Sequence, residues 1–138
     1  MADNTFLLEI TTPERLIARE HVSEAQIPGL DGYVGVLPGH APLLGELGFG
    51  ELSYKVAGQG HHVVVHGGFL EVSGDRVRVL CTSAEMPDQI DLARAKAALD
   101  RARKAMVARG DMDIASVMEA TKRAEARVKA AEKVAGRR

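Results

Sequence analysis

Apolar and polar residues alternate with a period of two along several segments near the start of the chain. In TFLLEI the apolar residues Phe6, Leu8 and Ile10 fall on one face, and in RVRVL the valines Val77 and Val79 alternate with arginines. This alternation is typical of strands that are buried on one face only. The runs ELSYKVA and HHVVVHG predict further short strands.

Glycine and proline separate these runs. Twelve of the 14 glycines and four of the five prolines fall within residues 1–86. Many short strands with frequent turns are typical of an antiparallel β-sandwich or a flattened barrel. We therefore expect an all-β domain over residues 1–86.

The apolar period changes at Pro87. A proline at the start of a helix, followed by Asp88 as the N-cap, is typical of a helix N-terminus. Two apolar stripes with helical spacing follow. Their members are Leu92, Ala95, Leu99, Ala102 and Met106 in the first stripe, and Val117, Thr121, Ala124, Val128 and Ala131 in the second.

The segment RGDMD between the stripes predicts a turn. Gly110 can end the first helix, and Asp111 or Asp113 can cap the second. Because the stripes have matching length, residues 87–138 predict an antiparallel helical hairpin. Both stripes are rich in alanine, and at about 25 cal/mol per Å² of buried apolar area we expect weak docking and a hairpin that can move.

The two segments carry opposite charge. Residues 1–86 contain 5 Lys and Arg against 11 Asp and Glu, a net of −6, and residues 87–138 contain 13 against 8, a net of +5. The total of −1 gives no reason to expect a nucleic-acid partner. We expect no signal peptide and no direct membrane insertion, because there is no basic leader and no apolar run approaches the roughly 18 residues of a membrane span.

The single cysteine, Cys81, cannot form an internal disulfide, which suits a reducing compartment. Its place in RVRVLC predicts a small buried apolar residue and not a nucleophile.

The glycine-rich loop GYVGVLPGHAPLL, from Gly32 to Leu44, could bind phosphate or form a rigid surface for another protein. The chain has no GxxxxGK[ST] motif, and GELGFG lacks the strand-then-helix context of a dinucleotide site. Pro38 and Pro42 restrict the backbone, so little entropy is lost when a partner docks. The pattern favours the recognition surface.

Three histidines, His61, His62 and His66, cluster in one predicted strand. His62 and His66 would share a face, and alternate histidines can bind a metal ion. No carboxylate or cysteine stands near them in the sequence, which favours ordinary strand histidines and no metal. A free-standing β-sandwich enzyme or metal-binding module that uses these three histidines is the alternative function.

Four arginines flank the apolar stripes of the predicted hairpin. At ~100° per residue, Arg94 and Arg101 lie within about 20° of each other on the first helix. Arg123 and Arg127 are an i, i+4 pair on the second helix, and folding about the turn would bring Arg127 level with Arg94. The arginines form either a solvated basic edge or a clamp for a polyanion, because guanidinium groups match phosphate geometry.

GYVGVLPGHAPLL, followed by GELSYKV, GGFLEV and RVRVL, resembles the N-terminal domain of the epsilon subunits of F-type, proton-translocating ATP synthases. The junction AEMPDQIDLARAKAAL and the two-helix tail resemble the same family, so the resemblance covers essentially the whole chain. LPGHAPLL is its most specific element. The resemblance implies a sandwich of about ten strands followed by a helical hairpin.

It also implies a non-catalytic subunit of the central stalk, peripheral on the cytoplasmic face of the bacterial inner membrane. The sandwich would connect the gamma subunit to the membrane rotor ring of c subunits. The hairpin would restrain ATP hydrolysis through the alpha/beta catalytic ring. Ring contacts would come from Gly32, Tyr33, Val34 and His40, with Tyr33 at a position where the family often has an acidic residue.

The resemblance implies that the protein requires no cofactor. Some bacterial members of this family bind ATP as a regulatory ligand through an [IL]DxxRA motif and arginines of both helices. IDLARA matches this motif at Ile90, Asp91, Arg94 and Ala95. The resemblance implies four further ATP contacts, at Glu85, Arg101, Arg123 and Arg127.

Overall fold

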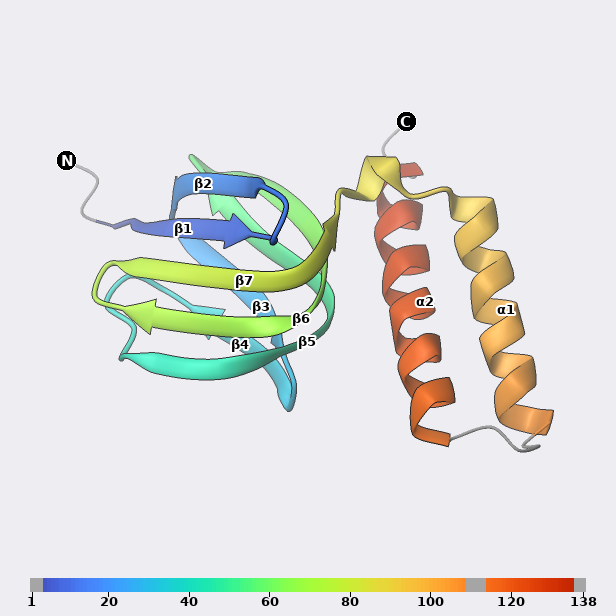
Figure 1. Cartoon of the computed structure of the whole chain (residues 1–138). Coiled ribbons are helices and arrows are strands. Elements are labelled where there is room, and N and C mark those ends of the chain that lie inside the picture. The colour runs from blue at the N-terminus through green and yellow to red at the C-terminus, as the bar shows by residue number, and fades with distance from the viewer. Residues whose placement is uncertain (1–3, 109–113, 136–138) are drawn as a thin grey trace. The chain divides into compact units, whose positions relative to one another are not determined.

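The computed structural model describes residues 4–108 and 114–135 of the 138-residue chain (Figure 1). Its strands are β1 (Phe6–Thr11), β2 (Leu16–Val22), β3 (Glu24–Gly29), β4 (Gly32–Val36), β5 (Leu43–Val56), β6 (Gln59–Ser73) and β7 (Arg76–Glu85). The chain divides into two compact units, Met1–Ala84 and Glu85–Arg138.

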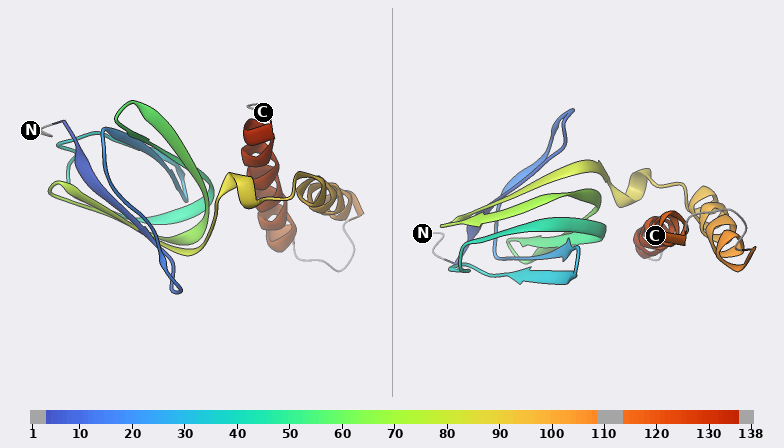
Figure 2. Two further views of the ribbon diagram at one scale, coloured as in Figure 1. Left: turned by 90° about the horizontal axis from the view of Figure 1, so that it is seen from above. Right: turned by 60° about the horizontal axis from the view of Figure 1, so that its bottom comes forward.

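The strands form one sheet in the order β2-β1-β7-β6-β5-β3-β4. β1 runs parallel to β7, whereas β1–β2, β3–β4, β3–β5 and β5–β6 are antiparallel pairs. The sheet curls over so that its strands lie in two layers (Figure 2). Because β2 and β4 end the strand order, the sheet is not a closed barrel. The all-β sandwich expected from the sequence is confirmed.

The sheet has seven strands where the resemblance implied about ten. The difference arises because β5 has 14 residues and β6 has 15, and the two strands pair along almost their whole length. Their ladder is interrupted around Gly48 and Gly67. Gly67 and Gly68 have φ values of 57° and 120°, which bend the strand without ending it.

The period-two alternation produces the core of the sandwich. Phe6, Leu8 and Ile10 of β1 are all buried, as are Val77 and Val79 of β7. These five residues confirm the faces that the sequence assigned to the two strands.

The second unit contains a 3-10 turn, η1 (Pro87–Gln89), followed by α1 (Leu92–Ala108) and α2 (Ile114–Ala135). The expected N-cap, Asp88, is wrong, because the turn ends at Ile90, whose backbone is extended. Asp91 caps α1 instead, since its Oδ1 accepts a hydrogen bond of 3.1 Å from the backbone N–H of Arg94. Pro87 therefore opens a separate turn and not the long helix.

α1 and α2 pack along the two predicted stripes. Ala95 and Leu99 of α1 form a buried cluster with Ala124 and Val128 of α2. Met106 is the main exception among the stripe residues, with 40% of its surface exposed. The stripes are therefore confirmed for most of their length.

The turn predicted at Gly110, with Asp111 or Asp113 as the cap, lies outside the described residues. Within residues 4–108 and 114–135, no helix has both the length and the apolar character to cross a membrane.

The bend at Gly68 generates a prediction about stability. A Cβ there would overlap the carbonyl oxygen of Leu80, and its positive φ is strained for other residues. We expect Gly68→Ala to destabilise the sandwich by at least about 2 kcal/mol. Gly45→Ala, whose Cβ would meet no atom within 4 Å, should have little effect. Tyrosine fluorescence during urea unfolding measures this, because both tyrosines, Tyr33 and Tyr54, lie in the sandwich; equal midpoints would contradict it.

Cys81 generates a second prediction. It is 3% exposed, its thiol donates to the carbonyl oxygen of Thr11 at 3.3 Å, and burial raises its pKa to about 11. We expect no reaction with Ellman's reagent in the folded protein at about pH 8 and full reaction in urea, because the folded thiol is protonated and covered. Fast labelling of the folded protein would contradict this.

The same raised pKa fixes the sign of a pH effect. The folded state holds the thiol proton more tightly than the unfolded chain, so the stabilisation is present below the ordinary pKa of 9.0 and is lost as the pH rises to about 11. Between pH 9.0 and about pH 11, the free energy of unfolding should therefore fall less in Cys81→Ala than in the wild type.

Candidate functional site

A cavity of about 420 Å³ in the second unit is lined by residues of η1, α1, α2 and the preceding strand end. The lining residues are Glu85, Gln89, Ile90, Asp91, Arg94, Ala95, Ala98, Arg101 and Arg127. Seven of the eight residues for which the resemblance implied ATP contacts are therefore brought together. Arg123, on α2, is not among the lining residues.

The start of α1 positions one side of the cavity. Ile90 is extended between η1 and α1, and Asp91 is held by its capping hydrogen bond to the backbone of Arg94. The side chains of Arg94 and Arg101 then project from the same face of α1, since they stand seven residues apart, about two helical turns.

Arg127 reaches the cavity from α2 and is held by Glu85. Its Nε and Nη2 donate to the same oxygen, Glu85 Oε1, at 2.8 and 2.7 Å. The Glu85 and Arg127 side chains are 32% and 38% exposed, so the pair contributes at most about 1 kcal/mol. Its main effect is to fix the direction of the guanidinium group.

Two ion pairs cross between the helices and show their register. Lys96 Nζ lies 3.6 Å from Glu132 Oε1, and Arg103 Nη2 lies 3.7 Å from Glu125 Oε1. The helices are therefore antiparallel, and this register sets Arg127 level with Arg101. The expectation that Arg127 lies level with Arg94 is wrong, because side-chain packing displaces one helix along the other and residues equally far from the turn do not face each other.

The cavity is suited to an anionic ligand of small-molecule size. Its volume lies within the roughly 300–1,000 Å³ of ligand pockets, and three arginines line it against two carboxylates, Glu85 and Asp91. Guanidinium groups bind phosphate oxygens with two parallel hydrogen bonds. The apolar residues Ile90, Ala95 and Ala98 also line the cavity.

Two lining residues, Gln89 and Ala98, were not identified from the sequence. Ala98 could have been found, because it stands four residues after Arg94 on the same face of the helix. Gln89 could not, because its position depends on η1, where its Oε1 accepts a hydrogen bond of 3.3 Å from the N–H of Met86.

A second cavity, of about 400 Å³, lies in the sandwich beside the predicted ring contacts. Gly32, Tyr33 and Val34 line it, whereas His40 does not. Tyr33 is 57% exposed, and its hydroxyl donates to the carbonyl oxygen of Glu51 at 3.1 Å. His40 is held by a turn, where its Nδ1 donates to the carbonyl oxygen of Ala41 at 2.6 Å.

Part of the segment that was expected to be a loop is a strand. Gly32–Val36 forms β4, which pairs with β3 and stands at one end of the strand order. Val36 is buried while Gly35 and Leu37 beside it are exposed, which is the alternation typical of a strand.

The three histidines occupy separate environments. His61 stacks on Tyr54 with ring centroids 5.2 Å apart, and His66 lies tilted against Phe49 at 5.6 Å. Within residues 4–108 and 114–135, no group of three or more His, Cys, Asp and Glu is placed to hold a metal ion. The geometry gives no support to the alternative of a histidine-based metal site.

One carboxylate that is distant in the sequence does lie beside a histidine in the structure. Glu51 Oε1 lies 2.5 Å from Nδ1 of His62, because the β5–β6 register sets Glu51 opposite Val64, two residues from His62. Cross-strand neighbours of this kind are visible only once the register is known.

Comparison with known proteins gives the family that the sequence resembles. Residues 5–87 match the model of the family described as ATP synthase, Delta/Epsilon chain, beta-sandwich domain. The chain is 54% identical to the ATP synthase epsilon chain of Solibacter usitatus, covering 94% of this chain and 98% of the relative. It is 46% identical to that of Koribacter versatilis, covering 80% and 77%.

A solved structure agrees with these relatives. One chain in the Euglena gracilis mitochondrial ATP synthase, OSCP/F1/c-ring, has a TM-score of 0.82 and 25% identity, covering 93% of this chain and 81% of that chain. The match extends over both compact units, so it includes the helix pair as well as the sandwich. This protein belongs to the family of ATP synthase epsilon chains.

Proposed function

We propose that this chain couples the gamma subunit to the membrane rotor ring of c subunits and restrains ATP hydrolysis through its helix pair. The epsilon chain is a stalk subunit of ATP synthase and not its catalytic subunit. The observation that carries the proposal is the 54% identity to an ATP synthase epsilon chain over 94% of this chain. The protein would act as a peripheral component of the complex, on the cytoplasmic face of the bacterial inner membrane.

The exposed surface around β4 supports the ring contact. Four large apolar residues between Leu30 and Leu44 are exposed, namely Leu30, Tyr33, Leu37 and Leu44. Exposed apolar residues in this number are typical of a surface that contacts another protein. Gly32, Tyr33 and Val34 line the cavity beside them. His40 would orient the adjoining turn through its bond to Ala41 and need not touch the ring directly.

The charge and packing of the second unit support a regulatory role. Residues 87–138 carry a net charge of +5, which suits contact with acidic surfaces of the alpha/beta catalytic ring. The seam between the helices is the contact of Ala95 and Leu99 with Ala124 and Val128. Half of these residues are alanine, so little free energy opposes a rearrangement. A helix pair of this kind can change its arrangement when a ligand or partner binds it.

The arginine-lined cavity supports ATP as the regulatory ligand. Phosphates would contact Arg94, Arg101 and Arg127, and the base would lie against Ile90 and Ala95. Arg123 would join them from the preceding turn of α2. A bound triphosphate would relieve repulsion among the arginines and connect α1 to α2, which favours the folded helix pair.

Truncation after residue 86 tests whether the sandwich alone assembles into the complex and whether the helices restrain hydrolysis. We expect residues 1–86 to assemble into the ATP synthase of membranes, because the proposed gamma and ring contacts lie in the sandwich. ATP hydrolysis by these membranes should rise above that with the full chain, since the restraining helices are missing. Failure of the truncated chain to join the complex, or an unchanged hydrolysis rate, would contradict the proposal.

Calorimetry of the isolated full chain with ATP tests the ligand. Charge-assisted hydrogen bonds contribute about 1.5–3 kcal/mol each, so Arg94→Ala or Arg127→Ala should weaken binding by roughly one to two decades. Lys104→Ala is the control, because Lys104 pairs with Asp100 on its own helix and does not line the cavity. No heat of binding at millimolar ATP, with or without magnesium, would leave the arginines as a solvated basic edge.

A further inference from the structure

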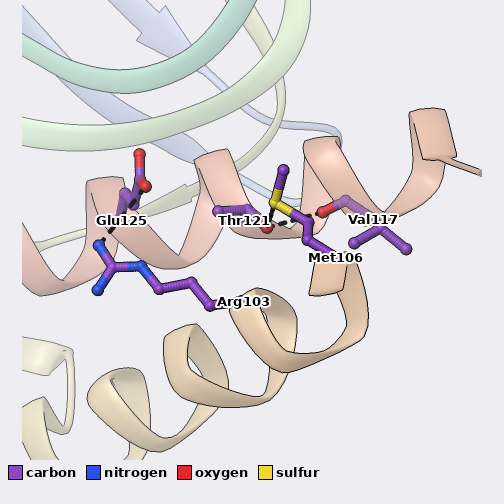
Figure 3. Close-up of polar contacts among 5 residues, drawn as sticks. All are labelled: Arg103, Met106, Val117, Thr121 and Glu125. Carbon is purple, nitrogen blue, oxygen red and sulfur yellow. Dashed lines mark hydrogen bonds and ion pairs between the residues drawn. The ribbon is translucent and has the colours of Figure 1, made fainter. Parts of the chain in front are cut away.

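The C-terminal end of α1 contacts the N-terminal half of α2 through two side-chain pairs (Figure 3). The hydroxyl of Thr121 lies 3.5 Å from the sulfur of Met106 and 2.8 Å from the carbonyl oxygen of Val117. One turn earlier on α1, Arg103 pairs with Glu125 at 3.7 Å. At this end of the pair, the sulfur of Met106 therefore lies directly on the seam.

Met106 is open to solvent although its neighbours across the seam are not. It is 40% exposed, whereas Val117 and Thr121 are buried. A small oxidant can therefore approach the Met106 side chain from the solvent side without prior opening of the helices. Reactivity of a methionine follows this exposure.

We propose that Met106 is an oxidation site at which a peroxide loosens the packing of α1 on α2. In the reaction with hydrogen peroxide, the sulfur attacks one oxygen, the O–O bond breaks, and the sulfur is oxidised by two electrons. That oxygen stays on the sulfur as a sulfoxide, and its proton leaves with the released hydroxide as water.

The geometry gives the direction of the effect. Thr121 Oγ1 lies 3.5 Å from Met106 Sδ on the seam side, so a peroxide adds its oxygen on the solvent side of the sulfur. The sulfoxide is polar and is better solvated in water than against the buried Val117, which favours side-chain conformations away from the seam and uncovers Thr121 and Val117. Because half of the buried cluster along the rest of the seam is alanine, whose side chain makes few contacts, little compensates for this loss.

Met118 is a matched control on the same helix pair. It is 44% exposed, close to the value for Met106, but it belongs to neither apolar stripe. Oxidation of Met118 adds the same polar group at a similarly accessible position. It should leave the packing of the helices unchanged.

The experiment compares the full chain before and after hydrogen peroxide, with oxidation at each methionine measured by peptide mass spectrometry. Hydrogen exchange is then followed in peptides from residues 92–108 and 114–135. We expect Met106 to be oxidised and exchange in these peptides to become about tenfold faster. Treatment with both methionine sulfoxide reductases should restore the slow exchange, since each reduces one sulfoxide epimer.

Three variants separate Met106 from the other methionines. Oxidised Met106→Leu should keep slow exchange, oxidised Met118→Leu should behave like the oxidised wild type, and Met106→Gln should exchange fast without oxidant. Full oxidation of Met106 with unchanged exchange would overturn the proposal, as would fast exchange in oxidised Met106→Leu. If Met106→Leu fails to fold, the same cycle of oxidation and enzymatic reduction is followed in the triple variant Met86→Leu, Met112→Leu, Met118→Leu, in which Met106 is the only methionine besides Met1. The proposal concerns the helix pair alone and does not depend on the restraint of hydrolysis.

Discussion

Half of the buried cluster between α1 and α2 is alanine, and this limits how strongly apolar contact alone can hold the helices together. The cluster contains two alanines, Ala95 and Ala124, beside the larger Leu99 and Val128. An alanine side chain removes little apolar area from water, and the free energy of burial is proportional to that area. Polar contacts at the flanks of the seam therefore have a large share in setting the arrangement of the helix pair.

Those flanking contacts are themselves weak. The Lys96–Glu132 and Arg103–Glu125 pairs are well exposed, and such pairs contribute up to about 1 kcal/mol each. The Glu85–Arg127 pair holds one guanidinium group at the cavity. The free energy that holds the helix pair in its arrangement is therefore a sum of small contributions. A ligand that binds the arginines, or an oxygen added to Met106, changes this sum. The sandwich differs, because fully buried residues such as Leu8, Val65 and Val79 form a close-packed core.

Much of the fold follows from local patterns in the sequence. The alternation around Leu8 and Val79 and the helical spacing of Ala95 and Val128 both identified residues that are buried. Helical spacing singled out Arg94, Arg101 and Arg127, whereas Glu85, Ile90, Asp91 and Ala95 were expected only from the family resemblance. What the sequence could not supply depends on contacts between distant segments. The Glu51–His62 pair needs the β5–β6 register, and the level of Arg127 needs the stagger of the helices. Asp91 replaces Asp88 as the cap because η1 ends in an extended residue.

The account depends most directly on the claim that three arginines of one cavity bind the same ligand. Titration of the full chain with ATP, followed by NMR of the arginine Nε–H groups, measures each guanidinium separately. The signals of Arg94, Arg101 and Arg127 should shift together with one dissociation constant, while those of Arg76 and Arg103 stay in place. Shifts spread evenly over all these arginines, or no shift at saturating ATP, would contradict the account.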